Sequence, residues 1–240
     1  MAKDKIYADE RRAGAPFEFN AEVAAVFPDM LERSIPGYAM TIDAIAALAR
    51  RFVTGGSHCY DLGCSLGAAA LAMRDSISEP GCRIFAIDNS AAMVERCRSI
   101  VGSTEQVEIS VQQRDIREIV VENASMVVMN YTLQFLPVAD RDDLLRRICS
   151  GMLPGGVFVL SEKVRDDDDR IEALLVDLHH GFKRRNAYSE LEISRKRAAL
   201  EDVLIPESIA THRRRLAAAG FRHVGIWLRH YNFVSIVALR

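Results

Sequence analysis

Short apolar runs alternate with amphipathic stretches through the middle of the chain. The apolar runs cover residues 58–62, 82–88, 107–111, 125–130 and 156–160. Helical spacing of apolar positions lies between them, near residues 66–77, 90–101 and 140–152. This alternation is typical of a parallel sheet covered by helices, and continuous apolar runs fit strands that are buried on both faces. The pattern therefore predicts a doubly wound α/β core.

Helices are expected on both sides of this core. Ahead of it, Asn20 and Thr41 are predicted to cap two helices within about 20–53. Behind it, residues 166–219 contain no convincing strand and predict a helical insertion. There Ser189 begins a capping-box sequence, and Pro206 suits the first turn of another helix.

The end of the chain alternates again. Gly220 is expected to end a helix, and the runs 224–228 and 233–239 are separated by a short turn. These two runs predict a terminal antiparallel pair of strands. A length of 240 residues suits one domain over 1–240.

Composition narrows the possible functions. The chain has 31 Lys+Arg against 33 Asp+Glu and a net charge of −2, which excludes a polycation that coats nucleic acid. Its five cysteines form no C-x-x-C pair and predict reduced core thiols in a cytoplasmic protein, without a metal site. The aspartate run 166–169 predicts a solvated helix start. No segment resembles a membrane helix or a signal peptide.

The loop after the first apolar run has the pattern Gly63-Cys64-Ser65-Leu66-Gly67. Glycine at position 63 allows a ligand to approach the backbone, and glycine at position 67 allows the following helix to pack on the sheet. The spacing differs from the dinucleotide motif G-x-G-x-x-G, and no Gly-Lys-Ser/Thr follows as in a P-loop. The loop therefore predicts a nucleoside site without a phosphate cradle.

Polar residues follow the next strands in order. Asp88 is placed to bind both ribose hydroxyls, Asp115-Ile116 to meet an adenine amino group, and Asn130 to face the reactive end of the ligand. Each has a structural alternative, since Asp61 and Asp88 could cap helices, Asp115 could occupy a turn, and Asn130 could bond local backbone. Together they favour a bound adenosine such as that of S-adenosylmethionine.

These motifs resemble the class I methyltransferase fold, a mostly parallel seven-stranded sheet with a terminal antiparallel pair. A narrower set of segments resembles the carboxy-S-adenosyl-L-methionine synthases over about residues 19–239. It comprises residues 26–30, 33–38, 86–90, 122–128, 179–184 and 188–194, together with Lys196-Arg197.

The resemblance implies a reaction in which the methyl carbon of S-adenosylmethionine receives a carboxyl group from prephenate, leaving phenylpyruvate. The product would serve a partner enzyme that modifies the wobble uridine of tRNA, so no direct nucleic-acid contact is expected. By the same resemblance the adenosyl ligand is bound by Tyr38, Gly63, Cys64, Ser65, Asp88, Asn89, Asp115, Ile116 and Asn130. No metal is implied.

Arg197 is the residue that the resemblance assigns to the new carboxylate, because arginine grips a carboxylate at two points. In family members the insertion reaches across a homodimer, so Arg197 could serve its own site or that of the neighbouring subunit. By charge alone Arg195-Lys196-Arg197 and Lys183-Arg184-Arg185 are typical of solvated helix faces. For His179-His180 we expect a structural or substrate-lining role.

Two other functions stay open at this point. An ordinary S-adenosylmethionine-dependent methyltransferase would need a pocket that admits a nucleophile instead of a dianion. A non-catalytic adenosyl-ligand binder would bind the ligand without turnover.

Overall fold

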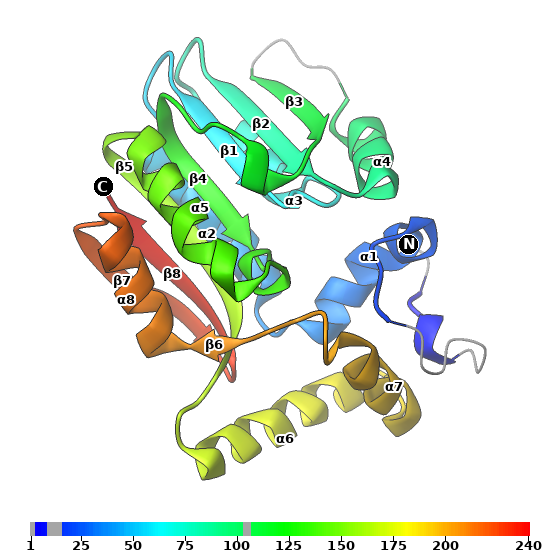
Figure 1. Cartoon of the computed structure of the whole chain (residues 1–240). Coiled ribbons are helices and arrows are strands. Elements are labelled where there is room, and N and C mark those ends of the chain that lie inside the picture. The colour runs from blue at the N-terminus through cyan, green and yellow to red at the C-terminus, as the bar shows by residue number, and fades with distance from the viewer. Residues whose placement is uncertain (1–2, 9–15, 103–106) are drawn as a thin grey trace.

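The computed structural model describes residues 3–8, 16–102 and 107–240. Its centre is a sheet in the order β3-β2-β1-β4-β5-β8-β7 (Figure 1). The strands are β1 (His58–Leu62), β2 (Arg83–Asp88), β3 (Glu108–Gln113), β4 (Ala124–Asn130), β5 (Met152–Arg165), β6 (Glu207–Ser208), β7 (His223–His230) and β8 (Phe233–Leu239). The doubly wound α/β fold expected from the sequence is confirmed.

Strands β1 to β5 run parallel, whereas β8 pairs antiparallel with both β5 and β7. The predicted terminal pair is therefore confirmed. The sheet has one strand more than the seven expected, because β6 pairs with the end of β5 at Val164 and Arg165. The prediction of no strand within 166–219 was wrong here, since two residues are too few to show a period in the sequence.

Two layers of helices cover the sheet. On one face α5 (Val138–Gly151) and α8 (Ile209–Ala219) bury Leu144, Leu145 and Leu216 against the strands. On the other face lie α2 (Tyr38–Phe52), α3 (Ala68–Arg74) and α4 (Ala91–Val101), which bury Ile45 and Met73. The strands are covered on both sides, which explains their continuous apolar runs. All five cysteines are buried and free, as predicted.

The N-terminal helices begin largely where the sequence predicted. Asn20 caps α1 (Ala21–Ser34) by accepting a hydrogen bond from the Val23 backbone N–H. The prediction that Thr41 caps the second helix was wrong. Helix α2 already begins at Tyr38 after a left-handed Gly37, and the Thr41 hydroxyl donates to the Gly37 carbonyl from within the helix.

Helices α6 (Asp169–Arg185) and α7 (Glu190–Leu200) stand below the sheet and meet α1 (Figure 1). Asp168 caps α6, so the aspartate run begins a helix as expected. Ser189 and Glu192 form the predicted capping box of α7. Pro206 does not begin a helix, because Ser208 is the cap of α8. Gly220 ends α8 in a left-handed conformation, as expected.

Candidate active site

A cavity of about 550 Å³ lies at the carboxyl ends of the parallel strands and is closed from below by α1, α6 and α7. This is the edge at which open α/β sheets bind ligands, and the volume suits a nucleoside-sized molecule. Nine of the predicted site residues line it, namely Tyr38, Gly63, Cys64, Ser65, Asp88, Asn89, Asp115, Ile116 and Asn130. The structure thus brings together residues from four strand ends and from α2.

In the loop after β1, every second residue from Gly63 to Gly67 has a left-handed backbone conformation. The φ angles of Gly63, Ser65 and Gly67 are 80°, 48° and 82°. A Cβ on Gly63 would lie 2.3 Å from the Thr132 side chain, so the glycine lets this loop pack against the end of β4. A Cβ on Gly67 would lie 2.8 Å from Cys97 Sγ, so this glycine lets the turn pack closely against α4. Helix α3, which follows it, packs on the sheet as expected. Both glycines are required by close contacts as well as by φ.

Two buried carboxylates hold this loop in place. Asp61 accepts a hydrogen bond from the backbone N–H of Ala70 at 3.0 Å, and Asp88 accepts from those of Ser65 and Ser90, each at 2.9 Å. Burial raises the pKa of Asp61 to about 7 and also raises the pKa of Asp88. The helix-cap alternative for the two aspartates is thus partly correct. Since Asp88 also lines the cavity, it is placed both to fix the loop and to meet a ribose.

The Asp115 carboxylate is already engaged. Arg117 donates to it from Nε and from a terminal nitrogen, at 2.6–3.1 Å, and these bonds hold the pKa of Asp115 below its usual range. The same arginine pairs with Asp140 at 2.9 Å. This geometry favours the backbone around Ile116, more than the Asp115 carboxylate, as the contact for an adenine.

Asn130 ends β4 with an unsatisfied acceptor. Its Oδ1 is buried and has no hydrogen-bond partner among the described residues, and it lines the cavity. Since buried polar atoms are nearly always paired, an orphan at a cavity wall indicates a ligand contact. Tyr131 follows with φ 63°, and its ring lies 6.5 Å from that of Tyr38. Two aromatic rings thus flank the predicted reactive end.

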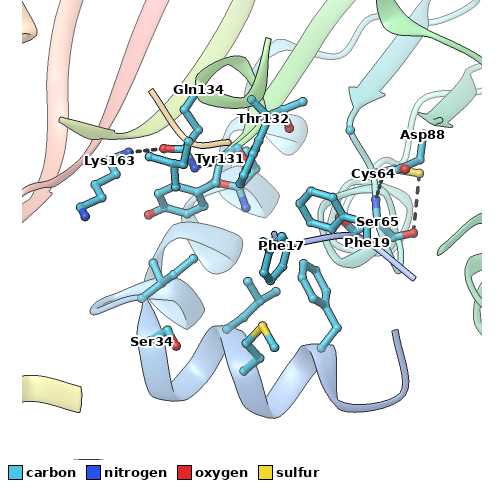
Figure 2. A pocket seen from close by; sticks show the side chains of 18 of the residues that line it. Phe17, Phe19, Ser34, Cys64, Ser65, Asp88, Tyr131, Thr132, Gln134 and Lys163 are labelled. Atoms are coloured by element: carbon cyan, nitrogen blue, oxygen red, sulfur yellow. Dashed lines mark hydrogen bonds between the residues drawn. The ribbon is translucent and has the colours of Figure 1, made fainter. Parts of the chain in front are cut away.

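Segments outside the strand ends build the rest of the wall. Phe17 and Phe19, which precede α1, reach the cavity from below, and Lys163 lies near Tyr131 on the side away from Ser65 and Asp88 (Figure 2). Lys183 of α6 and Lys196 of α7 also line it. None of these five was predicted as a site residue.

Lys183 and Lys196 each belong to a run of three basic residues, 183–185 and 195–197. Lys183 and Lys196 are buried, whereas Arg184, Arg185 and Arg197 are exposed. The expectation that these triplets form solvated faces was therefore wrong for the lysines. A 3.6-residue period places one residue of each triplet toward the protein, but only the packing of α6 and α7 decides which one.

His179 fulfils the role expected for it. Its Nε2–H donates to the Ser34 carbonyl at 2.8 Å, and the ring lines the cavity. Burial, with the nearby Lys183 charge, lowers the pKa of His179 to about 2. The imidazole is therefore neutral and joins α6 to α1.

Arg197 lies outside the cavity wall. It is exposed on α7. Burial lowers the pKa of Lys163 and of His180, and the charge of Arg197 lowers both further. The guanidinium thus acts on the same side of the cavity as Lys163. Its assignment to a carboxylate stays a prediction, as do the ligand roles of the nine residues that line the wall.

Within residues 3–8, 16–102 and 107–240, no group of three or more His, Cys, Asp or Glu side chains could hold a metal ion. Over the same ranges, the helices are too short or too polar to cross a bilayer.

Comparison with known proteins finds one similarity that covers part of the chain and another that covers all of it. A methyltransferase-domain family matches residues 60–156, from β1 into β5. The chain is 50% identical over 241 residues to the carboxy-S-adenosyl-L-methionine synthase of Pasteurella multocida, with 100% of both chains covered. It is also 50% identical to that of Photobacterium profundum, covering 99% of this chain and 98% of the relative.

Solved structures of methyltransferases share the fold. A putative O-methyltransferase from Nostoc punctiforme superposes with a TM-score of 0.62 at 17% identity, covering 92% of this chain and 60% of that one. Human N-acetylserotonin methyltransferase in complex with SAM gives 0.56 at 20% identity, covering 98% and 65%. The full-length relatives also include the segments that close the cavity from below. The chain therefore belongs to the carboxy-S-adenosyl-L-methionine synthase family.

Proposed function

We propose that this protein makes carboxy-S-adenosyl-L-methionine from S-adenosylmethionine and prephenate, with release of phenylpyruvate. The observation that carries the proposal is the 50% identity over the whole chain to a synthase of that name. The match to the methyltransferase-domain family covers only residues 60–156. The remaining segments supply Phe17, Lys183 and Lys196, which give the cavity an aromatic and cationic floor.

The chemistry follows from the two substrates. Prephenate becomes aromatic when it loses carbon dioxide and hydroxide, which leaves phenylpyruvate. A sulfonium acidifies the methyl group attached to it, so loss of a proton gives a carbanion that can form a bond to the carbon of carbon dioxide. The proton and the hydroxide together make water, and the atoms balance. The protein must hold both substrates in one enclosed space and keep bulk water from the carbanion.

The cavity has the features that this task requires. Asp88 lines the cavity beside the loop that is predicted to hold the adenosyl ligand, which is a cation, and its carboxylate accepts the Ser65 backbone N–H of that loop. Tyr131 lies between Lys163 and the Ser65 end of the cavity (Figure 2), and Asn130, which precedes it in the chain, also lines the cavity. A cationic ligand at one end and an anionic one at the other would meet near Asn130.

We also propose a homodimer. Helix α6 stands away from the sheet (Figure 1) and exposes Ile171, Leu174 and Leu178, which share one face at spacings of three and four. Leu191 at the start of α7 is exposed as well. A second copy of this chain would cover these side chains, and Arg197 on α7 would then lie close to the interface.

The product is proposed to pass to a tRNA carboxymethyltransferase in the cytoplasm. With a net charge of −2, the chain has no general electrostatic attraction for nucleic acid. The tRNA would therefore be bound by the partner enzyme and not by this protein.

Mass spectrometry tests the proposed activity. The purified protein is denatured to release any bound small molecule, and a second sample is incubated with S-adenosylmethionine and prephenate. We expect a product heavier than S-adenosylmethionine by one carbon dioxide, together with phenylpyruvate. Unchanged prephenate, with only S-adenosylmethionine or its demethylated form recovered, would leave the methyltransferase or the non-catalytic binder.

A further inference from the structure

Lysine is rare in this chain, and most of its lysines line the cavity. The sequence contains only five lysines but 26 arginines. Three of the five, Lys163, Lys183 and Lys196, line the cavity. The other two, Lys3 and Lys5, are exposed near the N-terminus. Most positive charges in this protein are thus arginines, whereas three of its five lysines line the cavity.

The three lysines come from three elements that meet beyond Asn130. In the sheet Asn130 pairs with Ser161, and Lys163 is two residues further along β5. Two residues of a strand span about 7 Å, so Lys163 lies just past the predicted reactive end. Lys183 is in the last turn of α6 and Lys196 is on α7, the helices that close this side.

Two of these ammonium groups have no acidic partner at close range. Among the described residues, neither Lys163 nor Lys183 forms an ion pair, whereas Lys196 lies 3.8 Å from Asp4 and donates to Ser34 Oγ at 3.0 Å. Glu172 of α6 acts on Lys163 only at longer range. Unmatched buried cations destabilise a fold, so their presence in a cavity wall indicates that an anion matches them.

The lysines also repel one another. Burial and the charges of Lys196 and Lys163 lower the pKa of Lys183 to about 7. Burial lowers the pKa of Lys196 to about 8, against the attraction of Asp4. Burial and the Arg197 charge lower the pKa of Lys163.

Further charged groups face the cluster from the neighbouring elements. Lys183 is close to the neutral His179, and Lys196 is also acted on by Arg33 and Asp29 of α1. Lysine can relieve repulsion by losing a proton, which arginine cannot do. A lysine cluster can therefore stay partly neutral while empty and become fully charged against an anion.

We propose that Lys163, Lys183 and Lys196 form the subsite for the two carboxylates of the second substrate, and that this subsite takes up protons when the dianion binds. The inference rests on the proposed function, in which that dianion is prephenate. It gives the lysines a role distinct from Arg197, which is predicted to bind the carboxylate of the product.

Calorimetry with a dead-end complex measures the proton uptake. The protein is saturated with S-adenosylhomocysteine, which has no methyl group to carboxylate, and is titrated with prephenate at pH 8 in two buffers of different ionisation enthalpy. At this pH a lysine with a pKa of about 7 is mostly neutral. We expect uptake of roughly one proton per site in the wild-type protein, and affinity for prephenate that falls as the pH rises through 7 to 9.

Substitutions assign the effect to residues. Lys183→Gln and Lys163→Gln are expected to raise the KM for prephenate at least tenfold and to leave the affinity for S-adenosylmethionine within twofold. Lys183→Arg, which keeps the charge but cannot release a proton, is expected to bind prephenate with reduced proton uptake. Lys5→Gln is the matched control, because it is an exposed lysine outside the cavity and should match the wild-type protein.

The outcomes separate this inference from the proposed function. Product formation by the wild-type protein, with an unchanged prephenate KM in both glutamine variants or with no proton uptake, would overturn the lysine subsite alone. Absence of product in the wild-type protein would contradict the proposed function itself. Should Lys183→Gln fail to fold, as judged by circular dichroism, Lys163→Gln decides the question, since Lys163 is less deeply buried.

Discussion

The backbone N–H of Ser65 donates to Asp88 Oδ2 at 2.9 Å, which fastens the loop after β1 to the end of β2. The other carboxylate oxygen of Asp88 accepts from the Ser90 backbone at 2.9 Å. Asp88→Asn can keep only one of these bonds, since an amide has one acceptor oxygen. We expect the affinity for S-adenosylmethionine, measured by calorimetry, to fall at least tenfold. Asp75→Asn, an exposed control, should leave it unchanged; an affinity within twofold for both variants would contradict the role of Asp88.

Gly37 tolerates no side chain, because a Cβ there would lie 2.2 Å from the His230 ring and φ is +78°. Gly56 has a similar φ of +72° but no atom within 4 Å of its Cβ position. We expect Gly56→Ala to lower the free energy of unfolding by about 1–2 kcal/mol, the penalty of φ alone. Gly37→Ala should lower it by a further 1–3 kcal/mol or so, from the clash. Urea denaturation measures both, and adding His230→Ala should recover the excess loss. Equal losses for the two glycine variants would show that the clash relaxes freely.

Arg141 is fully buried and joins α5 to the segment before α8. Its guanidinium donates to the carbonyls of Gln134, Leu136 and Ile205 and to the Glu207 carboxylate. Arg141→Met removes a donor from each of these carbonyls, although the Gln134 carbonyl still accepts from the Ile205 N–H. It should lower the free energy of unfolding by about 3–5 kcal/mol.

The matched control for this change is Arg146→Met on the same helix. Arg146 is exposed and, among the residues that the structure describes, pairs only with Asp143, so its loss should lower the free energy of unfolding by about 0.5 kcal/mol or less. Chemical denaturation of the two variants should therefore separate them clearly; similar midpoints would contradict the structural role of Arg141.

Glu162 makes stability depend on pH. Burial raises the pKa of Glu162 from 4.5 to about 8, although Arg141 opposes the shift. Because the folded-state pKa is the higher one, this contribution to stability is complete below about pH 4.5 and is lost as pH rises through about 8. Asp61, with a pKa of about 7, acts in the same direction.

Glu162→Gln keeps an acceptor for the Leu133 N–H but cannot ionise. We expect its Tm to fall less than that of the wild-type protein between pH 6 and pH 9, by about 3 °C or more, since 1 kcal/mol corresponds to about 2–4 °C in a domain of this size. Glu201→Gln on the surface should keep the wild-type slope. Parallel Tm curves for all three proteins would rule out the buried glutamate as the cause.

Arg197 is exposed on α7, so the proposed dimer predicts that it acts in a partner's site. Arg197→Met should reduce product formation at least tenfold, and Arg214→Met, also exposed, should not. Hybrid dimers of Arg197→Met with Asp88→Asn then decide which site Arg197 serves. If it serves the neighbouring subunit, each hybrid has one site that lacks both residues and one intact site, and mixing should restore activity. Activity that stays at the level of the two parents would place Arg197 in its own subunit's site.

Local patterns were enough to predict most of the fold. The five parallel strands, the terminal pair, the Asn20 cap and the Ser189 capping box all depend on residues that are close in sequence. Gly63, Asp88, Asp115 and Asn130 could be predicted as cavity residues because the carboxyl ends of parallel strands meet at one edge of the sheet. Tyr38, which is on α2, was predicted only from the family resemblance.

Tertiary packing decided what the sequence left open. Thr41 and Pro206 look like helix starts, but the turn at Gly37 and the cap at Ser208 override them. Within the basic triplets, lysine and arginine look alike in sequence, and the docking of α6 and α7 turned Lys183 and Lys196 into the cavity and left Arg197 outside. The reason is physical: strand and helix periods are set by neighbours along the chain, whereas burial of a charge is set by distant segments. The sequence by itself therefore predicted the strand-end residues that line the cavity, and only the tertiary structure revealed the lysines in its wall.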